Sequence, residues 1–152
     1  MAIIATIKTD GTGDYTSLAA WEDAVDGAST ADQWAECYAG GNLGAVTLNG
    51  WSSTPDSTNY PRIYAAEDNG HSASTTSGAF ISSAETFLIN SYIPYTRIEG
   101  LRLNQTSTSG YGVSFSSSGS SNGCRVEECL IHGSFAYGIA IGNTSGTTNV
   151  AF

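Results

Sequence analysis

The feature that most constrains this chain is a pair of phrases that occur twice, in the same order and at nearly the same interval. The phrase RIEGLRL, at 97–103, returns 28 residues later as RVEECLI, and YGVSF, at 111–115, returns 26 residues later as YGIAI. Repeats with a period in the twenties are typical of solenoids. Short β-type phrases separated by Gly, Ser and Asn favour strands joined by tight corners. The sequence therefore predicts an all-β fold, a parallel β-helix in which each turn winds through two or three short strands.

Alternation within each copy assigns side chains to two faces. The inward positions are Ile98, Leu101 and Leu103, then Val126, Cys129 and Ile131; the outward positions are Arg97, Glu99 and Arg102, then Arg125, Glu127 and Glu128. Because a strand has a period of two, the step from Ile98 to Leu101 requires a bend, which we place at Gly100. Neighbouring strands lie roughly 4.8 Å apart, so Ile98 is expected to stack on Val126 and Leu103 on Ile131.

One helix precedes the repeats. Leu18, Trp21 and Val25 share a helical face, Thr16 or Ser17 can cap its start, and Gly27 ends it. We expect this helix, around residues 16–26, to cover the apolar end of the first winding. The predicted organisation is an N-terminal strand and capping helix over 1–30, followed by β-helix turns over 31–152. Further strands are expected at 33–38, 45–49, 62–65 and 79–82, and a corner loop at 114–123.

A third copy of the repeat begins at Asn149 and stops at Phe152, so the sequence predicts that the chain continues beyond this point or that a partner covers the open end. Covering is expected because an open winding would expose about five apolar side chains, at roughly 1.5–3 kcal/mol each.

Composition and charge exclude several classes of function. The net charge is −9 and there are five Lys and Arg, which argues against nucleic-acid binding. No stretch of 18 apolar residues predicts a membrane span, and residues 1–8 lack the pattern of a signal peptide. The three Cys residues, one of them in an inward position, are interpreted as core thiols. We predict no cofactor and no metal site, and interpret Asp10 and Asp14 as turn residues in preference to calcium ligands.

The opening phrase DGTGDYTSLAAWEDAV resembles the start of right-handed parallel β-helix proteins of the pectin-lyase-like group. Asp10, Gly11, Gly13, Asp14 and Tyr15 match the pattern that precedes the capping helix of pectin methylesterases. The continuation Leu18 to Glu22 is most similar to β-helix proteins of bacteriophage particles. The resemblance implies a right-handed β-helix, and it implies function only weakly because one fold hosts many activities.

Enzymes of that group carry catalytic phrases that this chain lacks, and we predict no catalytic residue. The adjacent Glu127 and Glu128 are expected to face a corner and solvent, and His132 to stack on Asn104 in a hydrogen-bonded ladder rather than act as a base. Aromatic side chains instead suggest a sugar-stacking or protein-contact surface. The candidate ligand-binding residues are Trp51, Tyr60, Tyr92, Tyr95 and Tyr111.

The resulting hypothesis is a non-enzymatic structural or adhesive component of a phage particle, located in the virion as a head decoration, head fibre or tail fibre. Its expected partners are other virion proteins, copies of itself in a trimer, and host glycans, with no nucleic acid or membrane. The alternative is the N-terminal part of a polysaccharide-degrading enzyme (a lyase, hydrolase or esterase). A cell-surface adhesin is disfavoured by the absent signal peptide.

Overall fold

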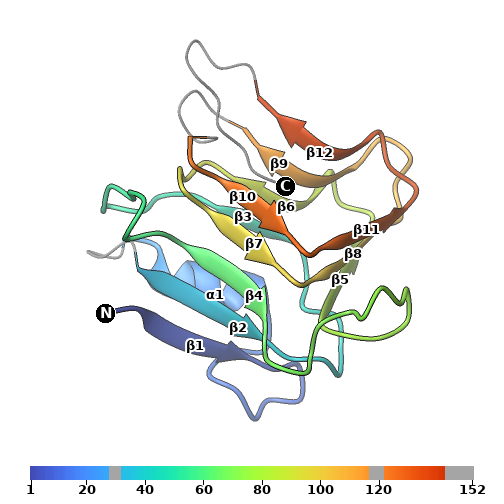
Figure 1. Cartoon of the computed structure of the whole chain (residues 1–152), viewed down its shortest axis with the longest axis horizontal. Coiled ribbons are helices and arrows are strands. Elements are labelled where there is room, and N and C mark those ends of the chain that lie inside the picture. Colours follow the sequence, from blue (N-terminus) through green and yellow to red (C-terminus); the bar gives the residue numbers. More distant parts are fainter. Residues whose placement is uncertain (28–31, 117–121, 143–152) are drawn as a thin grey trace.

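The computed structural model, drawn in Figure 1, describes residues 1–27, 32–116 and 122–142. Over these residues the chain winds through about five turns. The first turn contains β1 (Ile3–Ile7) and α1 (Leu18–Val25), and the second contains β2 (Gln33–Cys37) and β3 (Val46–Leu48). The third contains β4 (Arg62–Ala65), β5 (Phe80–Ser83) and β6 (Phe87–Ser91). The fourth contains β7 (Arg97–Glu99), β8 (Arg102–Gln105) and β9 (Tyr111–Phe115), and the fifth contains β10 (Arg125–Glu127), β11 (Leu130–Gly133) and β12 (Tyr137–Ile141).

The strands form three parallel sheets that run along the axis of the solenoid. Sheet A has the order β1-β2-β4-β7-β10, sheet B the order β5-β8-β11, and sheet C the order β3-β6-β9-β12. Every pairing between named strands is parallel and joins strands of consecutive turns. The predicted parallel β-solenoid is confirmed, whereas its right-handed sense stays a prediction.

The register of the repeats is the predicted one. Ile98 pairs with Val126, Leu103 with Ile131, and His132 with Asn104. Gly100, between β7 and β8, has φ +69°, a left-handed conformation that glycine adopts without cost. Glu128 turns the same corner one turn later with φ +52°, so a residue with a Cβ holds this conformation there.

The helix closes the first turn. Ser17 caps it by accepting a hydrogen bond from the Ala20 N–H at 3.2 Å, and Leu18 and Trp21 are fully buried. The helix follows β1 and packs against β3 as well as against β1 and β2, so it occupies the part of the first turn where later turns place a strand of sheet C. β1 pairs with β2 over its whole length, which makes the N-terminal strand the first strand of sheet A.

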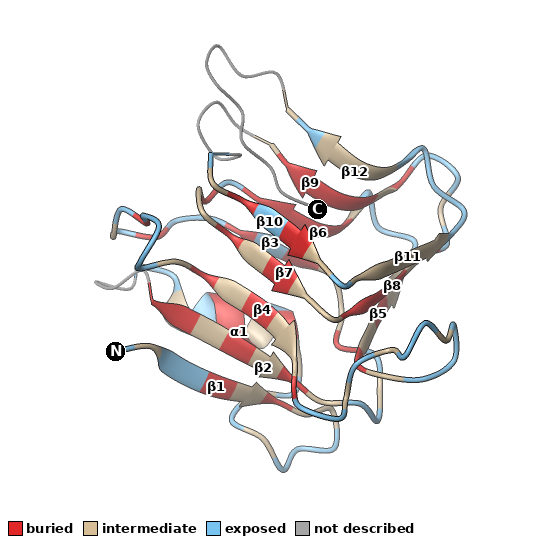
Figure 2. Ribbon diagram, in the orientation of Figure 1, coloured by how far each residue is buried: buried red, intermediate tan, exposed pale blue. Residues whose placement is uncertain are grey.

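Inward side chains from the three sheets form one continuous core (Figure 2). Ala35, Ile63, Ile98 and Val126 follow one another through sheet A in consecutive turns. Cys37 and Cys124 are fully buried in this core and Cys129 packs against it, as the interpretation of core thiols expects. Burial raises the pKa of Cys124 to about 12 and that of Cys129 to about 11.

The loop between β4 and β5 covers part of the outer face of sheet B. Arg102 alternates with the buried Leu103 and so leaves the core, as predicted, yet it is only 9% exposed. Its guanidinium lies 4.4 Å from the centre of the Phe80 ring and donates a hydrogen bond to the carbonyl of Thr75 in this loop. Arg102 therefore points out of the core and is still shielded from solvent by this loop.

A histidine in the same loop reaches two turns along the axis. His71 Nδ1 accepts a hydrogen bond from the Ala73 N–H at 2.8 Å, which leaves Nε2 as the protonated nitrogen. Nε2 lies 2.6 Å from the carbonyl oxygen of Glu128 and donates to it. The loop from the third turn is thus attached to a corner of the fifth turn.

The other predicted elements agree with the structure within one or two residues. The stretch 114–123 begins with the end of β9, and residues 117–121 lie outside the described residues, as does the third copy of the repeat at 149–152.

Candidate functional site

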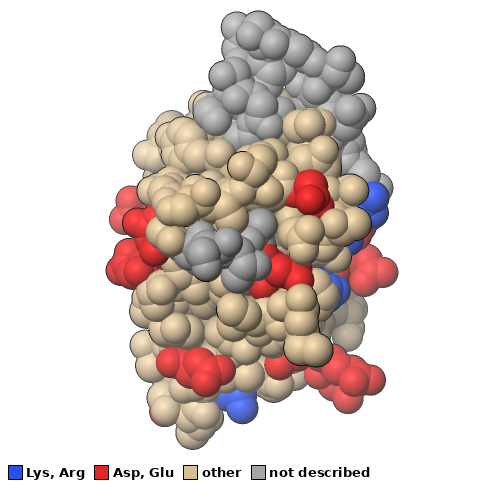
Figure 3. Space-filling view, turned by 90° about the vertical axis from the view of Figure 1, so that its left-hand side faces the viewer, with Lys and Arg blue, Asp and Glu red and all other residues tan. Residues whose placement is uncertain are grey.

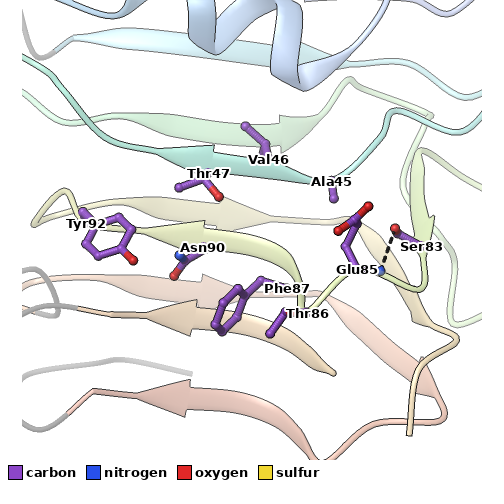
Figure 4. Close-up of a pocket in the computed structure, with 9 residues that line it drawn as sticks. All are labelled: Ala45, Val46, Thr47, Ser83, Glu85, Thr86, Phe87, Asn90 and Tyr92. Carbon is purple, nitrogen blue, oxygen red and sulfur yellow. Dashed lines mark hydrogen bonds between the residues drawn. The ribbon is translucent and has the colours of Figure 1, made fainter. Parts of the chain in front are cut away.

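A groove of about 640 Å³ lies on the outer face of sheet C, between the second and third turns (Figure 4). The second turn contributes small side chains to it, and the third turn contributes polar and aromatic ones. The lining residues are Ala45, Val46 and Thr47 from the second turn and Ser83, Glu85, Thr86, Phe87, Asn90 and Tyr92 from the third. Its size falls within the range of roughly 300–1,000 Å³ that is typical of pockets for small ligands.

One wall of the groove belongs to a column of stacked aromatic rings. The register of sheet C places Phe87, Tyr111 and Tyr137 opposite one another in three consecutive turns. The Phe87 and Tyr111 ring centres are 5.1 Å apart, and those of Tyr111 and Tyr137 are 5.6 Å apart, with interplanar angles of 27° and 14°. Phe87, Tyr111 and Tyr137 are called the aromatic column below. The column ends at Phe87, which is the member that lines the groove.

The floor of the groove is polar because outward positions of sheet C carry hydroxyl and amide groups. Thr47 pairs with Asn90, and Asn90 pairs with Ser114 one turn later. The Asn90 Oδ1 atom accepts a hydrogen bond from the Ser116 hydroxyl, which fixes the orientation of the amide and leaves Nδ2 as its donor. Asn90 is only 3% exposed, which places this amide at the base of the groove.

Glu85 supplies the charge at this site. It is the one charged residue among those that line the groove, and it is exposed in the corner between β5 and β6. Its main-chain N–H donates to the Ser83 hydroxyl at 3.0 Å, which holds the corner that carries the side chain (Figure 4). The groove therefore combines two aromatic rings, an amide donor, several hydroxyls and a carboxylate.

The five aromatic residues selected from the sequence do not form one surface. Tyr92, 45% exposed, lines the groove, and Tyr111 lies in the aromatic column behind Phe87. Trp51 is only 9% exposed and packs edge-on against Trp21 at 6.2 Å between ring centres, so it belongs to the core. The ring of Tyr95 packs over Gly123, where an added Cβ would lie 2.3 Å from its Cδ1.

Tyr60 belongs to a separate cluster outside sheet A. Its ring stacks on Trp34 at 6.0 Å, and the Arg97 guanidinium lies 3.5 Å from the centre of the Tyr60 ring. Arg62 forms an ion pair with the carboxylate of Glu99 in the next turn. The two residues are diagonal neighbours across β4 and β7, where opposite charges attract. These contacts hold the cluster together, although Trp34 Nε1 and Arg97 Nε are buried without a hydrogen-bond partner among the described residues. We interpret the cluster as structural.

The acidic and histidine side chains weighed as catalytic candidates lie away from the groove. Glu127 is on sheet A, 3.6 Å from Arg125, and Glu128 is at the corner between sheets A and B. His132 is on sheet B, where burial and then the nearby positive charge of Arg102 lower its pKa. His132 stacks on Asn104 in register, as predicted, and Asn104 donates to the Ser82 hydroxyl at 3.0 Å. His132 Nε2 is buried without a hydrogen-bond partner among the described residues, so the predicted hydrogen-bonded ladder does not extend to His132.

Asp10 and Asp14 shape the N-terminal turn. Asp10 accepts hydrogen bonds from the main chain and hydroxyl of Thr12, and Asp14 accepts the same pair from Thr6. These bonds lower the pKa of both carboxyls. The geometry agrees with the interpretation of turn residues.

Reasoning from the sequence missed Phe87, Asn90 and Glu85. A signal for Phe87 was present, because it precedes Tyr111 by 24 residues and Tyr111 precedes Tyr137 by 26, close to the repeat period. Asn90 and Glu85 have no such signal, since their importance depends on a hollow that only the folded turns create.

The fold and the groove define the molecule as a parallel β-solenoid with a polar and aromatic groove on one sheet. Comparison with protein-family models, with curated proteins and with solved structures finds no match. Among the described residues, no helix is both long and apolar enough to cross a membrane.

Proposed function

We propose that this protein is a non-enzymatic structural and adhesive component of a bacteriophage particle, such as a head decoration, head fibre or tail fibre. The observation that carries the proposal is the groove and aromatic column on the side of a β-solenoid. The phrase from Leu18 to Glu22, which resembles the corresponding part of phage β-helix proteins, points the same way. The partners in this proposal are copies of the chain in a trimer, other virion proteins and host glycans.

The physical properties of the fold suit such a role. Parallel pairing between successive turns satisfies the main-chain hydrogen bonds of inner strands and leaves unpaired edges at the ends of the stack. Repeated pairing of this kind makes a stiff stack, and unpaired strand edges at an end of such a stack favour association with other chains. Side chains on the outer faces remain available for contacts with ligands, as in the sheet C groove.

The assembly part of the proposal is tested by measuring the mass of the purified protein by light scattering. We expect the mass of three chains, or of a mixed assembly with particle proteins. We also expect antibodies against this protein to label purified particles from the source. A monomer of 15.8 kDa at all concentrations, together with particles that do not label, would contradict the proposal.

A second candidate is a polysaccharide-degrading enzyme, and the carboxylate of Glu85 beside a polar groove favours it. Its test is incubation with pectin, alginate and host polysaccharide, followed by detection of new reducing or unsaturated ends. Release that disappears in Glu85→Gln, or in variants of Glu127, Glu128 or His132, would replace the structural proposal with this one.

A further inference from the structure

We infer that the sheet C groove binds an uncharged pyranose of a larger glycan on the ring of Phe87, and that Glu85 discriminates against acidic sugars. This inference rests on the adhesive part of the proposed function and specifies its ligand. It concerns binding alone and involves no bond cleavage.

The shape of the groove leaves room for a ligand ring beside Phe87. The aromatic column fills three consecutive turns with rings whose centres lie 5.1 and 5.6 Å apart. The second turn continues this face with Ala45, Val46 and Thr47, so among the described residues no aromatic ring lines the groove on the second-turn side of Phe87. The groove is therefore the place where a ligand ring can stack, at a spacing close to the roughly 4.8 Å between turns.

The polar groups provide the second step. Sugar rings offer apolar C–H faces and a rim of hydroxyls, and a flat aromatic ring beside hydrogen-bonding groups is complementary to both. Nδ2 of Asn90 is a donor in a fixed orientation, because Oδ1 is engaged by Ser116. The hydroxyl of Thr47 can donate or accept, and Glu85 accepts. These groups lie at the floor and rim of the same groove (Figure 4).

Charge provides the third step. Glu85 is the one charged group among the lining residues, so no Lys or Arg in the groove balances a carboxylate on a ligand. The chain as a whole carries a net charge of −9, and acidic side chains are spread in several groups over the face shown in Figure 3. The carboxylate of Glu85 repels an anionic group on a ligand, so uronic acids and sulfated sugars are disfavoured.

The experiment compares neutral and acidic oligosaccharides by saturation-transfer NMR and calorimetry on the full chain. The neutral probes are oligomers of glucose, galactose, mannose and N-acetylglucosamine, and the acidic probes are oligogalacturonate and oligomannuronate. We expect at least one neutral probe to bind, with an affinity about tenfold or more above that for any acidic probe. Glu85→Gln is expected to reduce the ratio between the affinity for neutral probes and the affinity for acidic probes.

Variants locate the binding. Phe87→Ala removes the stacking ring, and Ala45→Trp fills the groove from the second turn while the residues of the aromatic column stay unchanged, so both are expected to weaken binding at least tenfold. The matched control is Tyr64→Ala, which removes a half-buried ring from sheet A. Circular dichroism confirms that each variant keeps the β-fold, and Ala45→Trp keeps the test informative if Phe87→Ala unfolds.

Three outcomes overturn the inference: no probe binds, an acidic probe binds best, or neutral binding survives Ala45→Trp in a folded protein. None of them changes the mass or the particle labelling that test the proposed function. Conversely, a monomer that binds a neutral probe in this groove would support the inference while contradicting the assembly proposal.

Discussion

At the scale of single residues, equivalent corners of two turns use different residues for the same conformation. Gly100 and Glu128 both have positive φ, and a Cβ at Gly100 would also lie 3.3 Å from the Cβ of Ala65. We expect Gly100→Ala to lower the free energy of unfolding by about 1–2 kcal/mol. Glu128→Gly is expected to raise it by about 0.5 kcal/mol, since relief of strain exceeds the added chain entropy. Urea unfolding of both variants measures the difference, and equal effects of the same sign would contradict it.

Glu22 gives a second residue-scale prediction, on pH dependence. Burial first, and then the charges of Asp26 and Asp23, raise the pKa of this helix residue, while one bond from the Asn49 N–H at 3.0 Å opposes the shift. Because the pKa of Glu22 is higher in the folded state than its ordinary value of 4.5, protonation of this side chain stabilises the fold. This contribution is complete below pH 4.5 and is lost as the pH rises through the folded-state pKa.

Glu22→Gln keeps an oxygen acceptor for Asn49 without the buried charge. We therefore expect this variant to be more stable than the parent at pH 7, with a difference that shrinks as the pH falls toward 4. Thermal unfolding between pH 4 and pH 7 measures it. Glu67→Gln, which changes an exposed acid that does not act on the Glu22 pKa, serves as the control. A gain that does not change with pH would rule out this cause.

At the scale of elements, the capping helix depends on the residue that precedes it. Ser17 accepts from the Ala20 N–H, and no acidic residue in the first turn supports the helix start. We expect Ser17→Ala to cost about 1 kcal/mol of stability, and Ser17→Asp to retain it because a carboxylate also caps and complements the helix dipole. Denaturant unfolding compares the three proteins. The prediction fails if Ser17→Asp loses as much stability as Ser17→Ala.

Elements were predictable from the sequence where repetition or periodicity exposed them. The spacing of Leu18, Trp21 and Val25 located the helix, and the two copies around Gly100 and Glu128 located strands, corners and register. The groove was not predictable, because it depends on which side chains of two different turns are small. Aromatic composition selected Trp51 as readily as Tyr92, although one is buried and the other exposed, since residue type alone does not report burial.

At the scale of the whole molecule, stability depends on columns of core side chains that continue from turn to turn. Ile98 lies between Ile63 and Val126 and is fully buried. We expect Ile98→Ala to cost about 2–5 kcal/mol and Ile98→Val about 0.5–1.5 kcal/mol. The larger loss is a substantial part of the roughly 5–15 kcal/mol typical of a folded domain. Guanidinium unfolding followed by Trp fluorescence measures both, and a loss below 1 kcal/mol in Ile98→Ala would contradict the continuous column.

The attachment of His71 to the Glu128 carbonyl has a consequence for how the stack opens. In a linear array, fraying of one repeat ordinarily affects only the repeat beside it. Here the β4–β5 loop of the third turn is hydrogen-bonded to the corner between β10 and β11 in the fifth turn, so opening of that corner also breaks a contact with a segment two turns away. Amide hydrogens around Glu128 should therefore exchange together with those of residues 67–78. The long polar loop then belongs to the same cooperative unfolding unit as the fifth turn.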